Sequence, residues 1–256
     1  MRIDAPRVEF SPSVRALWEE AFGNIDGFLD KFERYGYDAE KFRAVTALGE
    51  IVSGHYIFDC EYDGGRVAYI YGVATKAEHR GKGYSTALLE DTRRYLEAEG
   101  YAGAILVPAS KSLFSFYERL GYKKCSYVTE IHVTQGENAL PLRQLNAREY
   151  MEQRDEFLPR GAVLQNKGKM LDYIASDNEF FVGDGFILAA REYITDEGES
   201  ALYAAELLGD TDRAGDILTS LGCSRGVFRT VGDGKPFSAY LSLNGAPPPT
   251  WFAFEM

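Results

Sequence analysis

The residues best suited to bind an anion lie in segment 80–85, which reads Arg-Gly-Lys-Gly-Tyr-Ser. Gly81 and Gly83 let the backbone turn tightly and expose its N–H groups just before a predicted helix. Unpaired N–H groups and the positive end of a helix dipole favour a phosphate or pyrophosphate. Arg80 and Lys82 add positive charge at the same place, so the sequence predicts a phosphate site here.

The spacing of the glycines excludes two common nucleotide loops. A Walker loop needs the pattern GxxxxGK[ST], which this segment does not have. A dinucleotide fingerprint needs GxGxxG, and its last position is occupied here by Thr86. The strand that precedes the segment also belongs to a predicted meander and does not open a βαβ unit. The ligand is therefore expected to be another phosphate-bearing molecule.

The elements that must position this segment follow from the spacing of apolar residues. Apolar residues at helical spacing predict one or two helices in 14–32. Three strands follow, with Gly64-Gly65 as the tight connection between the last two, and then an alternation of helices and strands. The predicted strands are 42–48, 51–61, 66–75, 103–107 and 126–133, and the later helices are 85–99 and 111–120. This order predicts an α/β (α+β) fold in which helices flank a mixed, mostly antiparallel sheet.

The second half repeats a similar order of elements. Residues 134–145 are polar and contain Gly, Asn and Pro, as in a linker. The helices expected beyond them are 147–158, 167–174 and 211–221, and the strands are 179–191, 201–208, 226–231, 237–243 and 250–255. A repeat near half the chain length favours a duplicated fold. The predicted division is a first domain at 1–134, a linker at 135–145 and a second domain at 146–256.

Two motifs together resemble the GNAT N-acetyltransferase superfamily. Segment 80–85 resembles its [RQ]-x-x-G-x-[GA] pyrophosphate loop, with Arg80 first, Gly83 central and Ser85 in place of the usual Gly or Ala. The later helix of the family reads Asn-x6-Tyr-x-x-Leu-Gly-[FY]. This chain has Ser110 at the Asn position and then Tyr117 in register, within the run Phe-Tyr-Glu-Arg-Leu-Gly-Tyr at 116–122. The resemblance covers roughly residues 10–133.

The resemblance implies an acyltransferase that moves an acetyl group from acetyl-CoA to a primary amine of a small molecule or peptide by direct attack. Tyr117 matches the general-acid tyrosine that protonates the leaving thiolate. The strand before the loop would carry the pantetheine arm of coenzyme A, and a backbone amide near Val73 would contact the thioester oxygen. The residues expected to bind acetyl-CoA are Val73, Ala74, Thr75, Arg80, Gly81, Lys82, Gly83, Tyr84, Ser85, Thr86 and Ser110.

No general base can be assigned from the sequence. Many relatives place a Glu on the strand before the loop, where this chain reads Val-Ala-Tyr-Ile-Tyr at 67–71. Asp59, Glu61 and Glu130 are candidates, although each is more typical of a solvated carboxylate at a strand end. His79 lies beside the loop, where a surface position or a phosphate contact fits better than proton abstraction.

The second half resembles a degenerate copy of the same fold. Its loop position, 208–215, reads Leu-Gly-Asp-Thr-Asp-Arg-Ala-Gly and places two aspartates where phosphate would bind. We therefore expect one cofactor site, in the first half. Two alternatives stay open: a non-catalytic acyl-CoA sensor, which would not need Tyr117, and an aminoacyl transferase of the duplicated GNAT type, whose RNA substrate fits poorly with the acidic charge.

Composition narrows the remaining classes. The net charge is −11 with a pI of about 4.9, which disfavours nucleic acid and anionic membranes as partners. No stretch has the length and apolarity of a membrane span or a signal peptide, so we expect a soluble, cytoplasmic protein. The three cysteines and three histidines are scattered, which predicts neither disulfides nor a metal site. The sequence allows a homo-oligomer and does not identify the acceptor amine.

Overall fold

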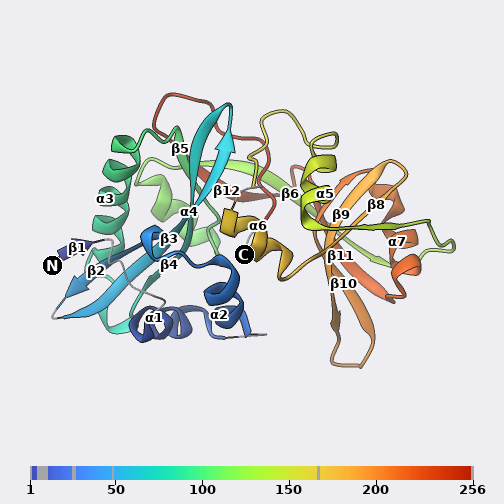
Figure 1. The fold of residues 1–256 in the computed structure, drawn as a ribbon, viewed down its shortest axis with the longest axis horizontal. Coiled ribbons are helices and arrows are strands. Elements are labelled where there is room, and N and C mark those ends of the chain that lie inside the picture. Colours follow the sequence, from blue (N-terminus) through green and yellow to red (C-terminus); the bar gives the residue numbers. More distant parts are fainter. Residues whose placement is uncertain (1, 5–10, 25–26, 48, 166–167, 255–256) are drawn as a thin grey trace. The chain divides into compact units, whose positions relative to one another are not determined.

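The computed structural model describes residues 2–4, 11–24, 27–47, 49–165 and 168–254. Contacts divide the chain into two compact units that do not follow one linear cut (Figure 1). Unit 1 contains residues 1–124, 167–173 and 238–248, and unit 2 contains residues 125–166, 174–237 and 249–256. Each unit is built on a mixed, mostly antiparallel sheet with helices packed against it, which confirms the predicted fold class.

The sheet of unit 1 has the order β1-β2-β3-β4-β5-β12. All neighbours in it are antiparallel except β4 and β5, which are parallel. Asp63 and Gly64, both with positive φ, join β3 to β4 in a two-residue turn, so the turn lies one residue earlier than predicted. The strands are β1 (Arg2–Asp4), β2 (Phe42–Ala47), β3 (Glu50–Tyr62), β4 (Gly65–Thr75), β5 (Gly103–Leu106) and β12 (Lys235–Ser242).

The helices of unit 1 cover both faces of its sheet because β3 and β4 alternate apolar side chains between the faces. Ile57 and Ile70 pack toward α3 and α4, whereas Phe58 and Tyr71 belong to an aromatic cluster with Trp18 of α1. The helices are α1 (Pro12–Phe22), α2 (Phe28–Lys31), which continues into a π-helical turn at Phe32–Gly36, α3 (Tyr84–Ala98) and α4 (Lys111–Glu118). Short 3-10 turns lie at Ala39–Lys41 and Ala77–His79.

The sheet of unit 2 has the order β6-β11-β10-β9-β8-β7, again with one parallel pair, β10 and β11. Its strands are β6 (Lys123–Thr134), β7 (Arg143–Leu145), β8 (Glu179–Gly183), β9 (Phe186–Ile194), β10 (Ser200–Gly209) and β11 (Arg225–Val231). Its helices are α5 (Ala147–Arg154) and α7 (Ala214–Leu221), the latter preceded by a 3-10 turn at Thr211–Arg213. Helix α6 (Gly168–Ala175) lies mainly in unit 1, which contains its residues up to Tyr173.

Two strand predictions in the second half are wrong. The strand expected over 179–191 is a hairpin of β8 and β9, because Gly185, with a positive φ, allows a tight turn at 184–185. The strand expected over 250–254 is irregular: Trp251 makes only an isolated bridge to Ala162, and Gln165 holds the backbone N–H of Phe254. Residues 143–145, expected within the linker, form β7. The predicted elements also include Leu48, Lys167 and Glu255, which lie outside the described residues.

A buried ionic cluster ties together three segments of unit 2. The carboxylate of Glu206 on β10 accepts hydrogen bonds from Arg154, Tyr150 and the Trp251 indole, at 2.5–2.7 Å. Arg154 and Glu206 are 1% and 0% exposed, and their contact is bidentate. A buried charge is tolerated when it is paired and fully hydrogen-bonded, and this carboxylate meets both conditions.

The two sheets share a further detail. In unit 1 the parallel pairing of β4 with β5 ends at Tyr69, and an extra residue then interrupts the pairing of β4 with β3. In unit 2 the parallel pairing of β10 with β11 ends at Ala204, and an extra residue, Ala205, follows in the pairing of β10 with β9. Each unit therefore has a β-bulge on the strand that leads into its crossover helix.

Candidate active site

The last residues of β4 have a free edge toward β5. The parallel pairs are Val67–Gly103, Ala68–Ala104 and Tyr69–Ile105, and no further pair joins the two strands in the described chain. Beyond Tyr69, backbone groups of β4 that would point toward β5 therefore have no strand partner there. Such unpaired N–H and C=O groups can bind an extended ligand as an added strand would bind.

Gly72 lies in the bulge that interrupts the pairing of β4 with β3, between Tyr71 and Ala74. Its φ is +62°, and a Cβ atom on it would lie 2.6 Å from the Trp18 ring. Only glycine satisfies both the backbone conformation and the close approach of the indole. Trp18 is itself fully buried on α1. The sequence analysis missed Gly72, although a glycine inside a strand pattern is a signal for a bulge.

The three β4 residues expected to contact pantetheine lie at this free end. Val73 packs against the apolar cluster that includes Tyr117 and Leu106. The carbonyl of Ala74 accepts a hydrogen bond from the Ser53 hydroxyl at 2.9 Å, and the Thr75 hydroxyl lies 2.9 Å from the same Ser53 oxygen. The strand end is therefore held in place from the β3 side while its β5 side is open.

The loop between β4 and α3 is compact because several hydrogen bonds fix its first half. The backbone N–H of Lys76 donates to Val52 at 3.0 Å, and the N–H of Ala77 donates to the carboxylate of Glu20 on α1 at 2.5 Å. The Arg80 Nε donates back to the Thr75 carbonyl at 3.0 Å, so its guanidinium is held beside the strand end. The chain thus reaches the two glycines in a defined direction.

The second half of the loop presents backbone donors to solvent. Gly81 and Gly83 have φ values of +73° and +79°, and a Cβ on either would meet nothing within 4 Å. The first hydrogen bond of α3 runs from the Ala87 N–H to the Gly83 carbonyl, so the preceding N–H groups of the helix have no intrahelical partner. No side chain caps this helix end. Gly81, Lys82 and Gly83 are exposed, which leaves the N-terminus of α3 open to an anion.

The predicted loop residues on α3 lie at its first turn. Tyr84, Ser85 and Thr86 are half-buried, and Tyr84 packs against the small apolar cluster of Val45, Val52 and Leu88. The helix is fixed to the sheet by its buried stripe, Leu88, Leu89, Thr92 and Leu96, at helical spacing. Arg80 and Lys82 are both exposed at this end of the helix.

Tyr117 is positioned by the way α4 ends. The N–H of Tyr122 donates to the Tyr117 carbonyl at 3.1 Å, and the N–H of Gly121 donates to the Glu118 carbonyl at 3.0 Å. With Gly121 at φ +92°, these bonds form a Schellman motif, and the Tyr117 and Tyr122 rings pack 5.7 Å apart, as the motif's apolar contact does. The run Leu-Gly-Tyr at 120–122 therefore fixes the position of the Tyr117 ring.

The Tyr117 side chain is 6% exposed, and no hydrogen bond contributes to the electrostatics of its hydroxyl among the described residues. Burial raises the pKa of Tyr117 to about 12, because the phenolate would lose solvation. The phenol consequently keeps its proton at neutral pH and is free to donate it. Ser110 is exposed as the N-cap residue of α4, seven residues and about two helical turns before Tyr117, with its hydroxyl 3.0 Å from that of Ser112.

Two of the three candidate carboxylates, Asp59 and Glu130, are paired with cations. Burial alone would raise the pKa of Asp59, but hydrogen bonds from Lys41 at 2.6 Å and Tyr101 at 2.5 Å hold that pKa below its ordinary value. A hydrogen bond from Lys235, at 2.8 Å, lowers the pKa of Glu130 in unit 2. Carboxylates held in their charged form by cations are weak proton acceptors, so neither Asp59 nor Glu130 suits a general base near neutral pH.

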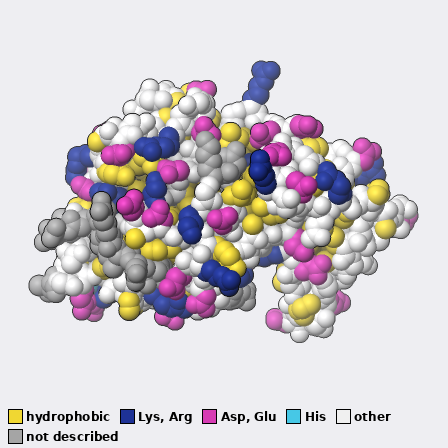
Figure 2. Space-filling model, in the orientation of Figure 1, with side chains coloured by type: hydrophobic (Ala, Val, Ile, Leu, Met, Phe, Trp, Pro, Cys, Tyr) yellow, Lys and Arg dark blue, Asp and Glu magenta, His cyan; other side chains and the backbone are white. Residues whose placement is uncertain are grey.

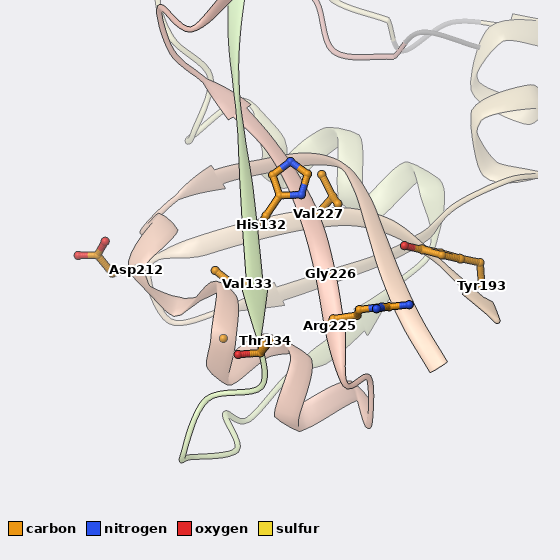
Figure 3. Close-up of a pocket in the computed structure, with 9 residues that line it drawn as sticks. His132, Val133, Thr134, Tyr193, Asp212, Arg225, Gly226 and Val227 are labelled. Carbon is orange, nitrogen blue, oxygen red and sulfur yellow. The ribbon is translucent and has the colours of Figure 1, made fainter. Parts of the chain in front are cut away.

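The corresponding loop of unit 2, residues 208–215, differs from the first because a carboxylate binds its backbone donors. The Asp210 carboxylate accepts hydrogen bonds from the Asp212 N–H and from Arg213 Nε, both at 3.1 Å. The Asp210 side chain therefore takes up the hydrogen-bond donors that a phosphate would need in this turn. A hollow of about 840 Å³ in unit 2 is lined by Asp212 of this turn and by His132 and Arg225 among others. These polar side chains point in different directions (Figure 3).

Other classes of site are not evident in the described residues. No group of three or more His, Cys, Asp or Glu side chains there could hold a metal ion, and none of the helices described has the length and apolarity that a membrane crossing requires. Acidic and basic side chains are interspersed on the face that Figure 2 shows. The loop at the end of β4 is thus the best-formed candidate site.

Comparison with known proteins matches the segment that contains this loop to a family model. Residues 3–125 match the model of the acetyltransferase (GNAT) domain. Among the curated proteins, none matches the sequence significantly. The fold is similar to that of a GCN5-related N-acetyltransferase from Anabaena variabilis, with a TM-score of 0.69 and 14% identity over 95% of this chain and 73% of that one.

Two further solved structures share the fold with similar TM-scores and identities. A GCN5-related N-acetyltransferase from Kribbella flavida has a TM-score of 0.66 and 15% identity, over 95% of this chain and 72% of that one. Eis1 from Mycobacterium abscessus has a TM-score of 0.63 and 13% identity, over 95% and 74%. At these identities the likeness concerns the fold, and the family assignment rests on the domain match together with the loop and the Tyr117 motif. The segment 3–125 of this chain belongs to the GNAT acetyltransferase superfamily.

Proposed function

We propose that the protein is an N-acetyltransferase with one active site, in unit 1, which transfers an acetyl group from acetyl-CoA to a primary amine. The observation that carries the proposal is the combination of an open β4 end, an uncapped α3 N-terminus and an unpaired, buried phenol on α4. Each feature suits one part of an acyl-CoA: the pantetheine arm, the pyrophosphate and the thioester sulfur. The GNAT domain match supports the assignment.

The residues present fit the pyrophosphate. Backbone N–H groups of Gly81, Lys82 and Gly83 and of the first turn of α3 would donate to its oxygens, with Arg80 and Lys82 supplying positive charge. Val73 to Thr75 would hold the pantetheine arm through the free edge of β4. Acetyl-CoA supplies the activated acyl group, and the chain contributes binding, orientation and a proton.

In the proposed reaction the amine nitrogen forms a bond to the acyl carbon while the carbon–sulfur bond breaks. A backbone N–H near Val73 would stabilise the charge that develops on the carbonyl oxygen. Tyr117 would donate its hydroxyl proton to the departing sulfur, and the ammonium would lose its proton to solvent. The phenolate would then take up a proton from solvent, which restores the phenol. The buried position of Tyr117 supports this role because Val73 packs against the apolar cluster to which Tyr117 belongs.

We further propose that the second half is a degenerate repeat that binds no acyl-CoA. Its support is the matching strand pattern, parallel pair and bulge in the two sheets. The Asp210 carboxylate in the corresponding turn would repel a pyrophosphate. The repeat boundaries, 1–134 and 146–256 around the linker 135–145, are a proposal about ancestry, since the compact units are composed differently.

The test is titration calorimetry with acetyl-CoA on the wild type and on Gly83→Asp. The new carboxylate would face the phosphates and weaken binding by roughly tenfold or more, which corresponds to about 1.4 kcal/mol per factor of ten. Gly100→Asp is the matched control, because Gly100 has a φ of +73° and open surroundings at the other end of α3. Equal affinities for both variants would move the site elsewhere.

Turnover separates the proposal from its alternatives. A panel of amines with acetyl-CoA, followed by thiol release, should show acceptor-dependent CoA formation. Binding without turnover on any amine would instead favour an acyl-CoA sensor. Absence of acetyl-CoA binding at millimolar ligand would reject the proposed function altogether.

A further inference from the structure

The pyrophosphate loop is tied to a helix that precedes it by a long stretch of chain. The N–H of Ala77 donates to the Glu20 carboxylate at 2.5 Å, across a separation of 57 residues. Ala77 opens the 3-10 turn at Ala77–His79, in which the Arg80 N–H donates to the Ala77 carbonyl at 3.2 Å. Glu20 therefore holds the first residue of the 3-10 turn that leads to Gly81 and Gly83.

Helix α1 is rigid enough to serve as an anchor. It begins with Ser11 as N-cap, whose hydroxyl accepts the Val14 N–H at 3.3 Å, and with Pro12 at the first turn. Val14, Leu17 and Trp18 are fully buried. Trp18 packs against the bulge at Gly72, and Glu20 lies two residues further along the same helix. One helix thus contacts both the bulge of β4 and the loop that follows β4.

The charge of Glu20 works against the proposed ligand. A carboxylate close to a pyrophosphate site repels phosphate, and Lys76, which faces it in this loop, is already paired with Glu50 at 2.9 Å. A hydrogen bond from a backbone N–H to a carboxylate is about twice as strong as a neutral one. Glu20 would therefore favour ligand binding through the hydrogen bond that it accepts from Ala77, and not through its charge.

We propose that Glu20 is a positioning residue for the acyl-CoA pyrophosphate loop, acting through the backbone N–H of Ala77. This inference rests on the proposed function for its kinetic part. Glu20 is exposed and contacts the loop from outside, so it does not touch the reacting atoms. Removal of the acceptor should loosen the turn and raise the KM for acetyl-CoA, whereas kcat should stay unchanged because Tyr117 lies on another element.

Three variants separate the hydrogen bond from the charge. Glu20→Ala removes both, Glu20→Gln keeps an acceptor oxygen without the charge, and Glu19→Ala removes a neighbouring exposed carboxylate on the same helix. We expect Glu20→Ala to raise the KM for acetyl-CoA roughly fivefold, as for loss of one partly exposed charged hydrogen bond. Glu20→Gln should match the wild type or bind more tightly, and Glu19→Ala should match the wild type.

Amide hydrogen exchange of the ligand-free variants supplies a readout that does not depend on activity. Glu20→Ala should speed exchange at residues 77–80 and leave α1 and α4 unchanged, and Glu20→Gln should restore protection. Equal KM and exchange for Glu20→Ala and Glu19→Ala would overturn the inference, as would a Glu20→Gln variant as impaired as Glu20→Ala. If the wild type bound no acetyl-CoA, the proposed function would fail, and the exchange data would still decide whether Glu20 anchors the loop.

Discussion

Acid should destabilise this protein through one buried histidine. His55 on β3 is fully buried against α3, where its Nε2 lies 3.1 Å from the Thr92 hydroxyl and its Nδ1 has no partner. Burial, together with the nearby Arg43 charge, lowers the pKa of His55 to about 3. An unfolded histidine titrates near 6.5, so between roughly pH 6.5 and 3 the unfolded chain takes up a proton that the folded chain cannot.

The sign and size of the effect follow from that difference. Stability from a neutral His55 is fully present above pH 6.5 and is lost as the pH falls, at about 1.4 kcal/mol per pH unit. Between pH 7 and pH 4 the loss from this group is about 3 kcal/mol. Other groups titrate in the same range, so the informative quantity is the difference from a variant that lacks the imidazole.

His55→Gln keeps a hydrogen-bonding side chain near Thr92 and cannot titrate. Urea unfolding followed by tryptophan fluorescence at pH 7, 6, 5 and 4 should show that the wild type loses stability more steeply than His55→Gln by about 1.4 kcal/mol per pH unit. His132→Gln, at an exposed position, is the matched control and should follow the wild type. Parallel pH profiles for the wild type and His55→Gln would refute the reasoning, whatever the variant's stability at pH 7.

Three further predictions concern the proton donor, the bulge of β4 and the buried ion pair of unit 2. Tyr117→Phe should lower kcat by about a hundredfold, as expected for loss of a general acid, with little change in acetyl-CoA affinity; equal turnover of variant and wild type would exclude the proton-donor role. Gly72→Ala should lower the free energy of unfolding by more than Gly64→Ala does, because both have a positive φ but only Gly72 has an indole 2.6 Å from the added Cβ. Urea melts of the two variants measure the difference, and equal losses would mean that the strand and the indole adjust without cost. Glu206→Gln should cost about 3–5 kcal/mol because it leaves the buried Arg154 charge without its counter-ion; a thermal melt close to that of the wild type would show that the pair is not essential.

Local patterns in the sequence predicted the parts of the site that adjacent residues make. The pair of glycines before an apolar helical stripe identified the open N-terminus of α3, since both the turn and the missing caps are properties of one short segment. Tyr117 was identified through the resemblance to a family motif, and the Leu-Gly-Tyr run of that motif forms the Schellman end of α4 in the structure. How these segments bind acetyl-CoA stays a prediction.

Features that join distant segments could not be read in this way. The bond from Ala77 to Glu20 has no signature in either segment, because an exposed glutamate on a helix usually faces water. Apolar residues near Trp251 suggested a strand. In the structure this buried segment is irregular, and the Gln165 side chain accepts hydrogen bonds from the backbone N–H groups of Ala253 and Phe254. Strand pairing was equally hidden, since apolar alternation predicts that β6 and β12 are strands without saying which edge each one joins.

The exchange of strands between the two halves of the sequence has a consequence for synthesis. Strand β12 pairs with β5 in unit 1, yet every strand from β6 to β11 lies between the two in the sequence. On the ribosome, the first half of the chain would emerge first and keep the hydrogen-bonding edge of β5 open until β12 is made. Open strand edges invite wrong pairing and aggregation. The chain should therefore depend most on chaperones while only its first half has been synthesised. A premature stop before residue 238 should yield a product prone to aggregation.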